Sequence, residues 1–377
     1  MKICLIAESY PPALGGVEYA LQKLVEGFID RGNEVRVVSS SWQRHSPAME
    51  KRGALTLVRV FTLPVFKRLW FILFSLPSVI RAVRWADVVQ GSTFAGGPPA
   101  FLAGWLMGKK KALIVHEVFG RRWFELEPNL MRSLFYYVTE WIIVHLPFDH
   151  YVAVSEYTRK SLQSLGISAK RITVIYHGDS KLESPDLSKE QARQQLGFEK
   201  DNVVFLSYGR TGVTKGFEYF AEAMPEIYKQ IPNARFALVL SGYDIRISAR
   251  IRKSVSSLPA GVCRLLEPVT REKLSTYMLA SDCVVLPSLT EGFGFVAREA
   301  CNAQKTVVAT CAGALPEVIS GRHVFVEPGS TQALVEGCIK TCWGQVSVAP
   351  PKIFSWERAV EQYLQLYVDL TDNKYAS

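Results

Sequence analysis

The sequence predicts an α/β protein of two domains, each organised around a parallel sheet. At 377 residues the chain is longer than one hydrophobic core usually serves, so two domains are expected. Near the N-terminus, residues 2–7 read as a buried strand, residues 17–31 as an amphipathic helix and residues 34–38 as a second strand. Such a βαβ unit places its two strands parallel in one sheet. A second unit of strand, glycine-rich loop and helix begins at residue 203 and opens the second domain.

Short apolar runs continue the strand pattern through both domains. One face of the first helix carries its apolar residues, which are Tyr19, Leu21, Leu24, Val25 and Phe28. Further strands of the first domain are expected at residues 87–90, 112–115, 151–155 and 172–175. A polar linker follows over residues 179–189. Strands of the second domain are expected at residues 203–207, 234–240, 263–266, 283–286 and 306–310.

The most informative motif lies between residues 283 and 303. A short strand ends before the turn Glu291-Gly-Phe-Gly294, and a helix is predicted from Phe295. Strand, glycine-rich turn and helix direct free N–H groups and a positive dipole end at an anion, typically a phosphate. Glu291 and Glu299 can face the same crevice, and carboxylates accept hydrogen bonds from sugar hydroxyls. The motif therefore indicates a nucleotide or a nucleotide sugar.

Two cations bracket glycines in the loop that follows the first strand of the second domain. The two cations are Arg210 and Lys215, in the stretch Tyr208-Gly-Arg-Thr-Gly-Val-Thr-Lys-Gly216. This stretch does not have the spacing of a Walker A loop. Arg supplies a fork of donors and Lys a point charge, and two cations that bracket glycines in a loop have little packing reason to be there. Near the N-terminus, Gly15-Gly16 opens the first helix in place of a G-x-G-x-x-G fingerprint, which argues against a nicotinamide enzyme.

A histidine follows the predicted strand at residues 112–115. Ligands in parallel sheets bind beyond the carboxyl ends of the strands, so His116 is a candidate site residue, with a structural role as the alternative. Tyr176-His-Gly-Asp179 precedes the linker, and the residues alone give no role to His177 or Asp179.

Four motifs, in this order, resemble those of the retaining glycosyltransferases of family 4, which have the GT-B architecture. They are Gly15-Gly16 after Pro11-Pro12, Gly209-Arg210 with Lys215-Gly216, Glu291 with Glu299, and Ala312-Gly-Ala-Leu-Pro-Glu-Val318. The resemblance implies two Rossmann-like domains facing each other across a cleft. Residues 1–178 would bind the acceptor, with a C-terminal helix at 355–377 packing back on them, and residues 179–354 would bind the nucleotide sugar. The chain departs from the family pattern at Ala312, at residues 176–179 and at residues 321–325.

The resemblance also implies roles for single residues. Glu299 would hold ribose hydroxyls, Glu291 sugar hydroxyls, and Arg210 with Lys215 the diphosphate, while His116 would contact the sugar. The implied catalytic residues are His116, Glu291, Arg210 and Lys215. The implied donor-binding residues are Gly15, Gly16, Gly209, Arg210, Lys215, Glu291, Gly292, Phe293, Gly294, Phe295 and Glu299.

The function implied is transfer of a hexose from a nucleoside-diphosphate sugar to an acceptor hydroxyl with retention of configuration. A UDP-sugar is the favoured donor and GDP-mannose the other candidate, while the acceptor is expected to be a lipid-linked saccharide or a cell-surface glycan precursor. No metal site is visible in the sequence, and no cofactor is expected, because the two cations can stabilise the diphosphate. The alternatives are a sugar-nucleotide epimerase of the same fold and a non-catalytic sugar-binding protein.

The basic excess lies in the N-terminal half. Residues 1–179 carry 22 Lys and Arg against 14 Asp and Glu, a net charge of +8 out of +9 for the chain. Apolar segments at residues 69–80 and 134–148 have basic neighbours, and six of eight Trp, Trp42 among them, precede residue 150. These features predict either a peripheral membrane surface or buried helices. Nucleic acid is not expected as a partner.

Cysteine usage and the N-terminus bear on the compartment. The seven cysteines are odd in number and form no C-x-x-C pair, which suggests buried reduced thiols. A strand begins at residue 2, so no signal peptide is expected. The expected location is the cytoplasm, with the cytoplasmic face of a membrane as an extension of it.

Overall fold

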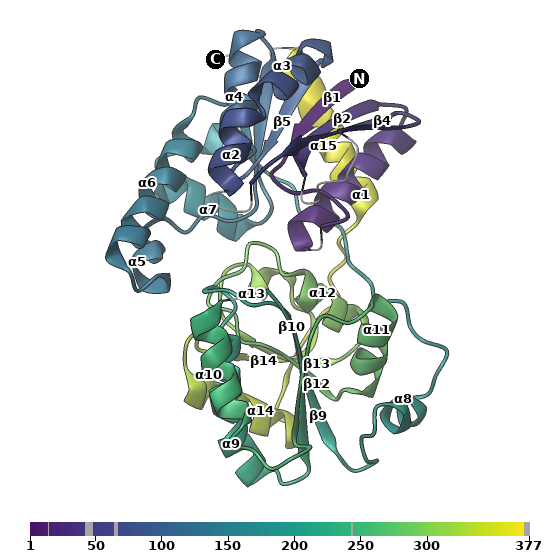
Figure 1. Ribbon diagram of the computed structural model, residues 1–377. Helices are drawn as coiled ribbons and strands as arrows, with labels where there is room; N and C mark the ends of the chain where they lie inside the picture. Colours follow the sequence, from purple (N-terminus) through teal and green to yellow (C-terminus); the bar gives the residue numbers. More distant parts are fainter. Residues whose placement is uncertain (14, 42–47, 64–66, 243, 373–377) are drawn as a thin grey trace. The chain divides into compact units, whose positions relative to one another are not determined.

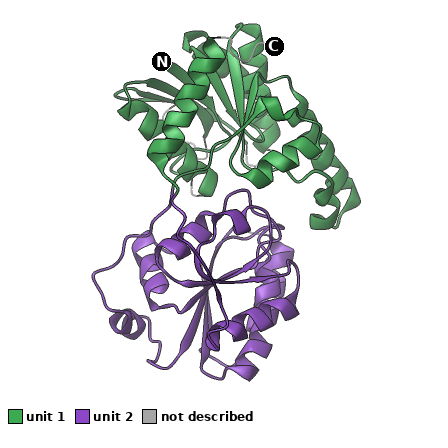
Figure 2. Ribbon diagram, turned by 180° about the vertical axis from the view of Figure 1, so that it is seen from behind, with its two compact units in different colours: residues 1–178, 354–377 green, residues 179–353 purple. Residues whose placement is uncertain are grey.

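A computed structural model describes residues 1–13, 15–41, 48–63, 67–242 and 244–372. The chain divides into unit 1, residues 1–178 with 354–377, and unit 2, residues 179–353 (Figures 1 and 2). Trp42 of the tryptophan count and residues 373–377 of the expected last helix lie outside the described residues.

Unit 1 is built on one sheet whose spatial order is β3-β4-β2-β1-β5-β6-β7-β8. All pairings described are parallel except that of β3 with β4, which form an antiparallel edge. From β1 the chain builds the sheet outward to β2 and β4, then returns to the other side of β1 at β5. The strands are β1 (Lys2–Ile6), β2 (Glu34–Ser41), β3 (Met49–Arg52), β4 (Leu55–Phe61), β5 (Val88–Ser92), β6 (Lys110–Val115), β7 (His150–Ala153) and β8 (Ile172–Val174).

Helices cover this sheet, and the last helix of the chain is one of them (Figure 1). Helix α1 buries Leu21, Leu24, Val25 and Phe28, as its apolar stripe predicts, while Tyr19 stays half-buried. Helix α15 packs against α1 through edge-on contacts of Tyr363 and Tyr367 with Phe28. The helices are α1 (Gly16–Asp30), α2 (Lys67–Phe74), α3 (Leu76–Trp85), α4 (Gly97–Leu106), α5 (Trp123–Leu126), α6 (Leu130–His145), α7 (Glu156–Ser164) and α15 (Trp356–Thr371).

Unit 2 repeats this plan with the order β11-β10-β9-β12-β13-β14-β15, in which β15 is an antiparallel edge strand. The strands are β9 (Val203–Arg210), β10 (Ala234–Ser241), β11 (Cys263–Leu266), β12 (Cys283–Leu286), β13 (Thr306–Thr310), β14 (Gly321–Val326) and β15 (Ser347–Ala349). The helices are α8 (Lys189–Gln195), α9 (Phe217–Gln230), α10 (Ile245–Val255), α11 (Arg271–Ala280), α12 (Phe295–Asn302), α13 (Leu315–Val318) and α14 (Thr331–Cys342).

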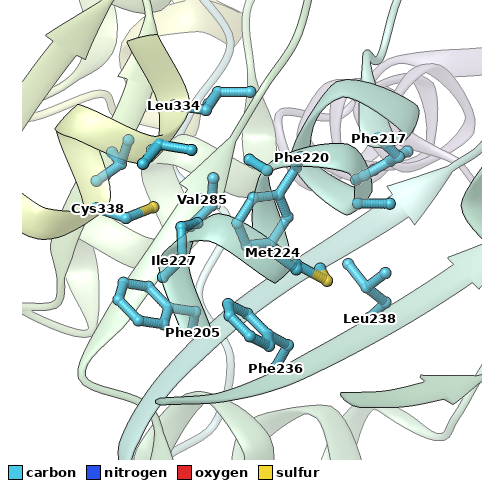
Figure 3. Close-up of a cluster of buried hydrophobic side chains, with 14 of the residues drawn as sticks. Phe205, Phe217, Phe220, Met224, Ile227, Phe236, Leu238, Val285, Leu334 and Cys338 are labelled. Carbon is cyan, nitrogen blue, oxygen red and sulfur yellow. The ribbon is translucent and has the colours of Figure 1, made fainter. Parts of the chain in front are cut away.

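The core of unit 2 fixes the strands whose ends carry the candidate site. Figure 3 shows Phe205 of β9 and Phe236 of β10 beneath Phe220 and Met224 of α9. The two strand rings stack at 5.7 Å between centroids, and Phe220 meets Phe236 edge-on at 6.0 Å. All four side chains are fully buried, so β9 is held firmly between its neighbours.

Three expectations need correction. Strands β3, β4, β14 and β15 are additional to the predicted strands, and helix α4 is additional to the predicted helices. The apolar segment at residues 69–80 is broken at Ser75 into α2 and α3, because Pro77 lies in the first turn of α3 and lacks the N–H that would continue α2. The thiols are free, but Cys311 and Cys342 are exposed rather than buried.

Candidate functional site

The candidate site of unit 2 lies where the strand order of its sheet reverses. The chain runs outward from β9 to β10 and β11, then returns to the other side of β9 at β12. At such a switch point the loops after two adjacent parallel strands diverge and leave a crevice for ligands. The loops in question, at residues 211–216 and 287–294, follow β9 and β12 directly.

Backbone contacts lock these loops together. The N–H of Leu289 donates to the carbonyl of Thr214 at 2.7 Å, and that of Ala314 donates to the carbonyl of Glu291 at 2.8 Å. Gly313 is left-handed with φ of +58°, and a Cβ there would lie 2.2 Å from the Glu291 carbonyl oxygen. The loop after β13 therefore buttresses the Glu291 turn at a position that only glycine fits.

Replacing Gly313 by alanine is expected to destabilise unit 2 more than replacing Gly321 by alanine. Both glycines have positive φ, but nothing lies within 4 Å of a Cβ built on Gly321. The difference in unfolding free energy should be about 1–3 kcal/mol, the usual cost of an overpacked contact. Denaturant unfolding of both variants measures this difference. Equal losses of unfolding free energy would contradict the prediction and mean that the Glu291 turn shifts to accommodate the added Cβ at little cost.

Helix α12 begins at the carboxyl edge of the sheet directly after the glycine turn. Its N-cap, Gly294, is left-handed with φ of 92° and has no side chain to cover the first N–H groups of the helix. Phe293 is buried and meets Phe295 edge-on at 5.1 Å between ring centroids. The structure thus places residues 291–295 in one turn that presents a positive helix end.

Lys215 and Glu291 form an ion pair between these two loops. The Lys215 Nζ lies 2.6 Å from Glu291 Oε1, and Ser288 Oγ donates to the same oxygen at 3.1 Å. The two side chains are 30% and 16% exposed, so both are only partly screened by solvent. Arg210, at the end of β9, is exposed. The structure therefore pairs Lys215 with Glu291 beyond the end of the strand that carries Arg210. The resemblance had implied separate roles for them, Lys215 at the diphosphate and Glu291 at sugar hydroxyls.

Glu299 is buried in a cluster of hydrogen-bond donors. Its Oε1 accepts from Ser180 Oγ at 2.6 Å and from Arg271 Nη2 at 3.4 Å, and its Oε2 accepts from Tyr208 Oη at 2.6 Å. Burial and the neighbouring Glu299 charge raise the pKa of Tyr208 well above its usual value. A carboxylate has about four acceptor positions, so the three bonds leave room for one more donor.

A buried ion pair joins the start of the linker to α12. Arg298 is 1% exposed, and its Nε donates to Asp179 Oδ1 at 2.7 Å. Its Nη1 and Nη2 donate to the carbonyls of Val318 and Lys352, both at 2.7 Å. Asp179, for which no role was predicted, therefore anchors the helix that carries Glu299.

In unit 1 the candidate histidine lies at the corresponding edge of the sheet. His116 follows β6, and its Nε2 is 3.0 Å from Ser92 Oγ at the end of β5. Its ring stacks on His177 at 5.7 Å between centroids, and His177 stacks on Trp356 at the same distance. Burial lowers the pKa of His116 to about 4, so the imidazole is neutral at neutral pH. Gly15 is the N-cap of α1, and Gly16 is its first residue.

Within the described part of the chain, no group of three or more His, Cys, Asp or Glu could hold a metal ion. Over the same residues, none of the helices combines the length and the apolar character that crossing a bilayer requires.

Comparisons with known proteins agree with this geometry. Residues 14–178 match the model of Glycosyltransferase Family 4, and residues 188–342 match that of Glycosyl transferases group 1. The chain is 21% identical to the phosphatidylinositol N-acetylglucosaminyltransferase GPI3 subunit of Saccharomyces cerevisiae, over 100% of this chain and 84% of the yeast protein. It is 28% identical to D-inositol 3-phosphate glycosyltransferase of Corynebacterium aurimucosum, over 58% of this chain and 56% of that protein.

Two solved structures share the fold over nearly their whole length. Sucrose-phosphate synthase from Thermosynechococcus elongatus superposes with a TM-score of 0.76 at 21% identity, covering 99% of each chain. HepE from Anabaena, solved with UDP and glucose, gives 0.71 at 20% identity, covering 99% of this chain and 98% of its own. With both family domains in order and the GT-B fold around them, the chain is a glycosyltransferase and belongs to glycosyltransferase family 4.

Proposed function

We propose that the protein transfers a hexose from a nucleoside-diphosphate sugar to an acceptor hydroxyl with retention of configuration. The observation that carries this proposal is the Lys215–Glu291 ion pair at the switch point of unit 2, at the start of the helix that holds Glu299. A cation for phosphate and two carboxylates for hydroxyls are the groups that this donor requires.

The donor would be held by its charges and its hydroxyls. Lys215 and Arg210 would bind the diphosphate beside the first N–H groups of α12, which Gly294 leaves uncovered. Lys215 has three N–H donors, so it can keep Glu291 while it binds a phosphate oxygen. Glu291 would then accept from a sugar hydroxyl, and Glu299 would use its remaining acceptor position for a ribose hydroxyl.

The reaction would proceed on one face of the sugar. The bond between the anomeric carbon and the phosphate oxygen breaks, and the acceptor oxygen bonds to the same carbon from the same side. The leaving phosphate oxygen takes the acceptor's proton, so no protein nucleophile is required. Lys215 and Arg210 would stabilise the charge that grows on the diphosphate.

A UDP-sugar is the favoured donor, with GDP-mannose as the other candidate. HepE was solved with UDP and glucose and, separately, with UDP-glucose, which supports the first choice. For the acceptor we propose a lipid-linked saccharide or a glycan precursor at the cytoplasmic face of a membrane. The yeast relative is named for a phosphatidylinositol acceptor, which supports a lipid.

Turnover of the donor tests the proposal. The full chain is incubated with each candidate sugar nucleotide and a mixture of lipid-linked acceptors, and both nucleotide release and the anomeric proton of the product are followed by NMR. Release of nucleoside diphosphate with an α-linked product from an α-linked donor is expected. Interconversion of the donor without an acceptor would instead identify an epimerase. Binding without any turnover would identify a sugar-binding protein.

A further inference from the structure

Helix α6 of unit 1 exposes an apolar face that the proposed reaction does not use. The exposed large apolar residues on it, here called the α6 stripe, are Leu130, Met131, Leu134, Phe135, Val138, Trp141 and Ile142. At 3.6 residues per turn these seven positions fall within about 140° of the helix circumference. The stripe is therefore one continuous face, whereas a monomeric protein in water usually scatters its exposed apolar residues.

The opposite face of α6 is firmly packed, so the stripe does not reflect a loosely attached helix. Ser133, Glu140, Ile143 and Val144 are buried. The Glu140 carboxylate accepts backbone N–H groups of Phe119 and Gly120, the latter at 2.6 Å. Burial raises the pKa of Glu140 to about 7. The one carboxylate of α6 thus points away from the stripe and is held inside unit 1.

Positive charge borders the stripe. Arg132 is exposed at its edge, and Arg121 is exposed just before α5, whose Phe124 is 42% exposed. The nearby exposed acid, Glu125, lies 3.8 Å from Arg122 and is balanced by it. The N-terminal half of the chain as a whole carries the net charge of +8. An apolar face with a basic border complements an anionic lipid surface.

We propose that the α6 stripe docks unit 1 on an anionic lipid bilayer, with α6 lying in the plane of the interface. A helix of 16 residues is about 24 Å long, which is shorter than a bilayer core, so it would lie on the membrane rather than cross it. Trp141 is 45% exposed and stacks on His145 at 4.2 Å between ring centroids. Tryptophan in such a place is typical of a membrane interface.

This docking surface deepens the proposed function. Only its link to a lipid-linked acceptor rests on that proposed function; the membrane contact itself does not. A stripe seated in the headgroup layer would bring unit 1 to lipid-linked acceptors. Vesicle binding requires neither donor nor turnover, so it can fail while transfer succeeds, or succeed while transfer fails.

Co-sedimentation of the full chain with vesicles tests the proposal. Vesicles of phosphatidylcholine alone are compared with vesicles that also contain phosphatidylglycerol, at low and at physiological salt. We expect binding to the anionic vesicles that weakens with salt. Phe135→Asp should weaken this binding roughly tenfold or more. The exposed ring of Phe135, which would be buried in the lipid interface, is replaced by a charge that anionic lipid repels. Trp343→Asp, a matched change at a 70% exposed residue of unit 2, should leave binding unchanged.

Three results would overturn the proposal. The first is a wild-type chain that stays in the supernatant with every vesicle. The second is equal binding of the Phe135→Asp and wild-type chains, which would place the contact elsewhere. The third is a wild-type dimer in light scattering that Phe135→Asp dissociates while neither chain binds vesicles, which would make a second copy the partner of the stripe. An unchanged thermal melt of each variant shows that it has folded.

Discussion

Replacing Lys215 by alanine is expected to lower turnover of the sugar nucleotide roughly 10²–10³-fold, the usual loss when one group that stabilises developing charge is removed. The ammonium lies 2.6 Å from Glu291, and the Lys215 side chain is 30% exposed. Without it, the Glu291 carboxylate would lose the ammonium that balances its charge beside the diphosphate. Steady-state kinetics should show a fall in kcat, because the interaction strengthens as the leaving group gains charge.

A matched control separates this effect from general charge loss. Lys229 of α9 in the same unit is 77% exposed and lies 3.7 Å from Glu226. Lys229→Ala removes the same side chain from a comparable ion pair at the surface, so turnover should stay at the wild-type level. Wild-type kcat in the Lys215→Ala enzyme would contradict the assignment of Lys215 to the leaving group.

Replacing Arg298 by methionine is expected to lower the free energy of unfolding of unit 2 by about 3–5 kcal/mol, the usual cost of removing one partner of a buried ion pair. Arg298 is 1% exposed, while the Asp179 side chain is 13% exposed. The change would remove the three hydrogen bonds that Arg298 donates to that carboxylate and to two backbone carbonyls. Hydrogen exchange of unit 2 peptides measures the loss separately from any opening of unit 1.

Two further variants sharpen this prediction. Arg322→Met alters an exposed arginine of β14 whose Nε lies 3.4 Å from Thr306, so it should change stability by less than about 0.5 kcal/mol. Asp179→Asn combined with Arg298→Met also removes the negative charge that Arg298 balanced and should recover part of the loss. Unchanged exchange protection in Arg298→Met alone would show that the pair does not hold α12.

The sequence predicted much of unit 2 because its signals are local. Residues 283–286 and 306–310 were expected as strands and form β12 and β13 with those bounds. Short buried parallel strands are continuous apolar runs between turn residues, which can be recognised without knowing their neighbours. In unit 1, β4 was missed because its burial alternates along the strand and it joins the sheet through long-range pairing with β2.

In the candidate site, too, features carried by local sequence could be predicted, whereas contacts between distant residues could not. The sequence placed Lys215 and Glu291 in glycine-rich loops after two predicted strands, but it did not predict that they form an ion pair, because the adjacency of β9 and β12 is a property of the folded sheet. The partners of Glu299 could not be, since Ser180 and Tyr208 lie 119 and 91 residues from it in the chain. Tyr208 offered one signal, a hydroxyl at the carboxyl end of a buried strand, whereas Ser180 offered none.

The apolar segments of the first half show where composition alone is ambiguous. Both 69–80 and 134–148 allowed a membrane surface or a buried helix. In the first segment, Val79 of α3 is buried whereas Leu73 of α2 is exposed, so part of the segment is core and part is surface. The second places Phe148 in the core and Phe135 on the surface. Only the packing of α6 decides which of its residues face outward.

Nucleotide binding tests most directly whether the carboxyl edge of unit 2 is a donor site. Thermal melts of the full chain are recorded with UDP, GDP or ADP, and repeated with the Lys215→Ala chain. One nucleotide, UDP being favoured, should stabilise the wild type by about 2.7 kcal/mol at a hundredfold excess over its Kd, and the variant should lose most of that shift. Melts of the wild type that none of the three nucleotides moves would contradict a nucleoside-diphosphate site at this edge.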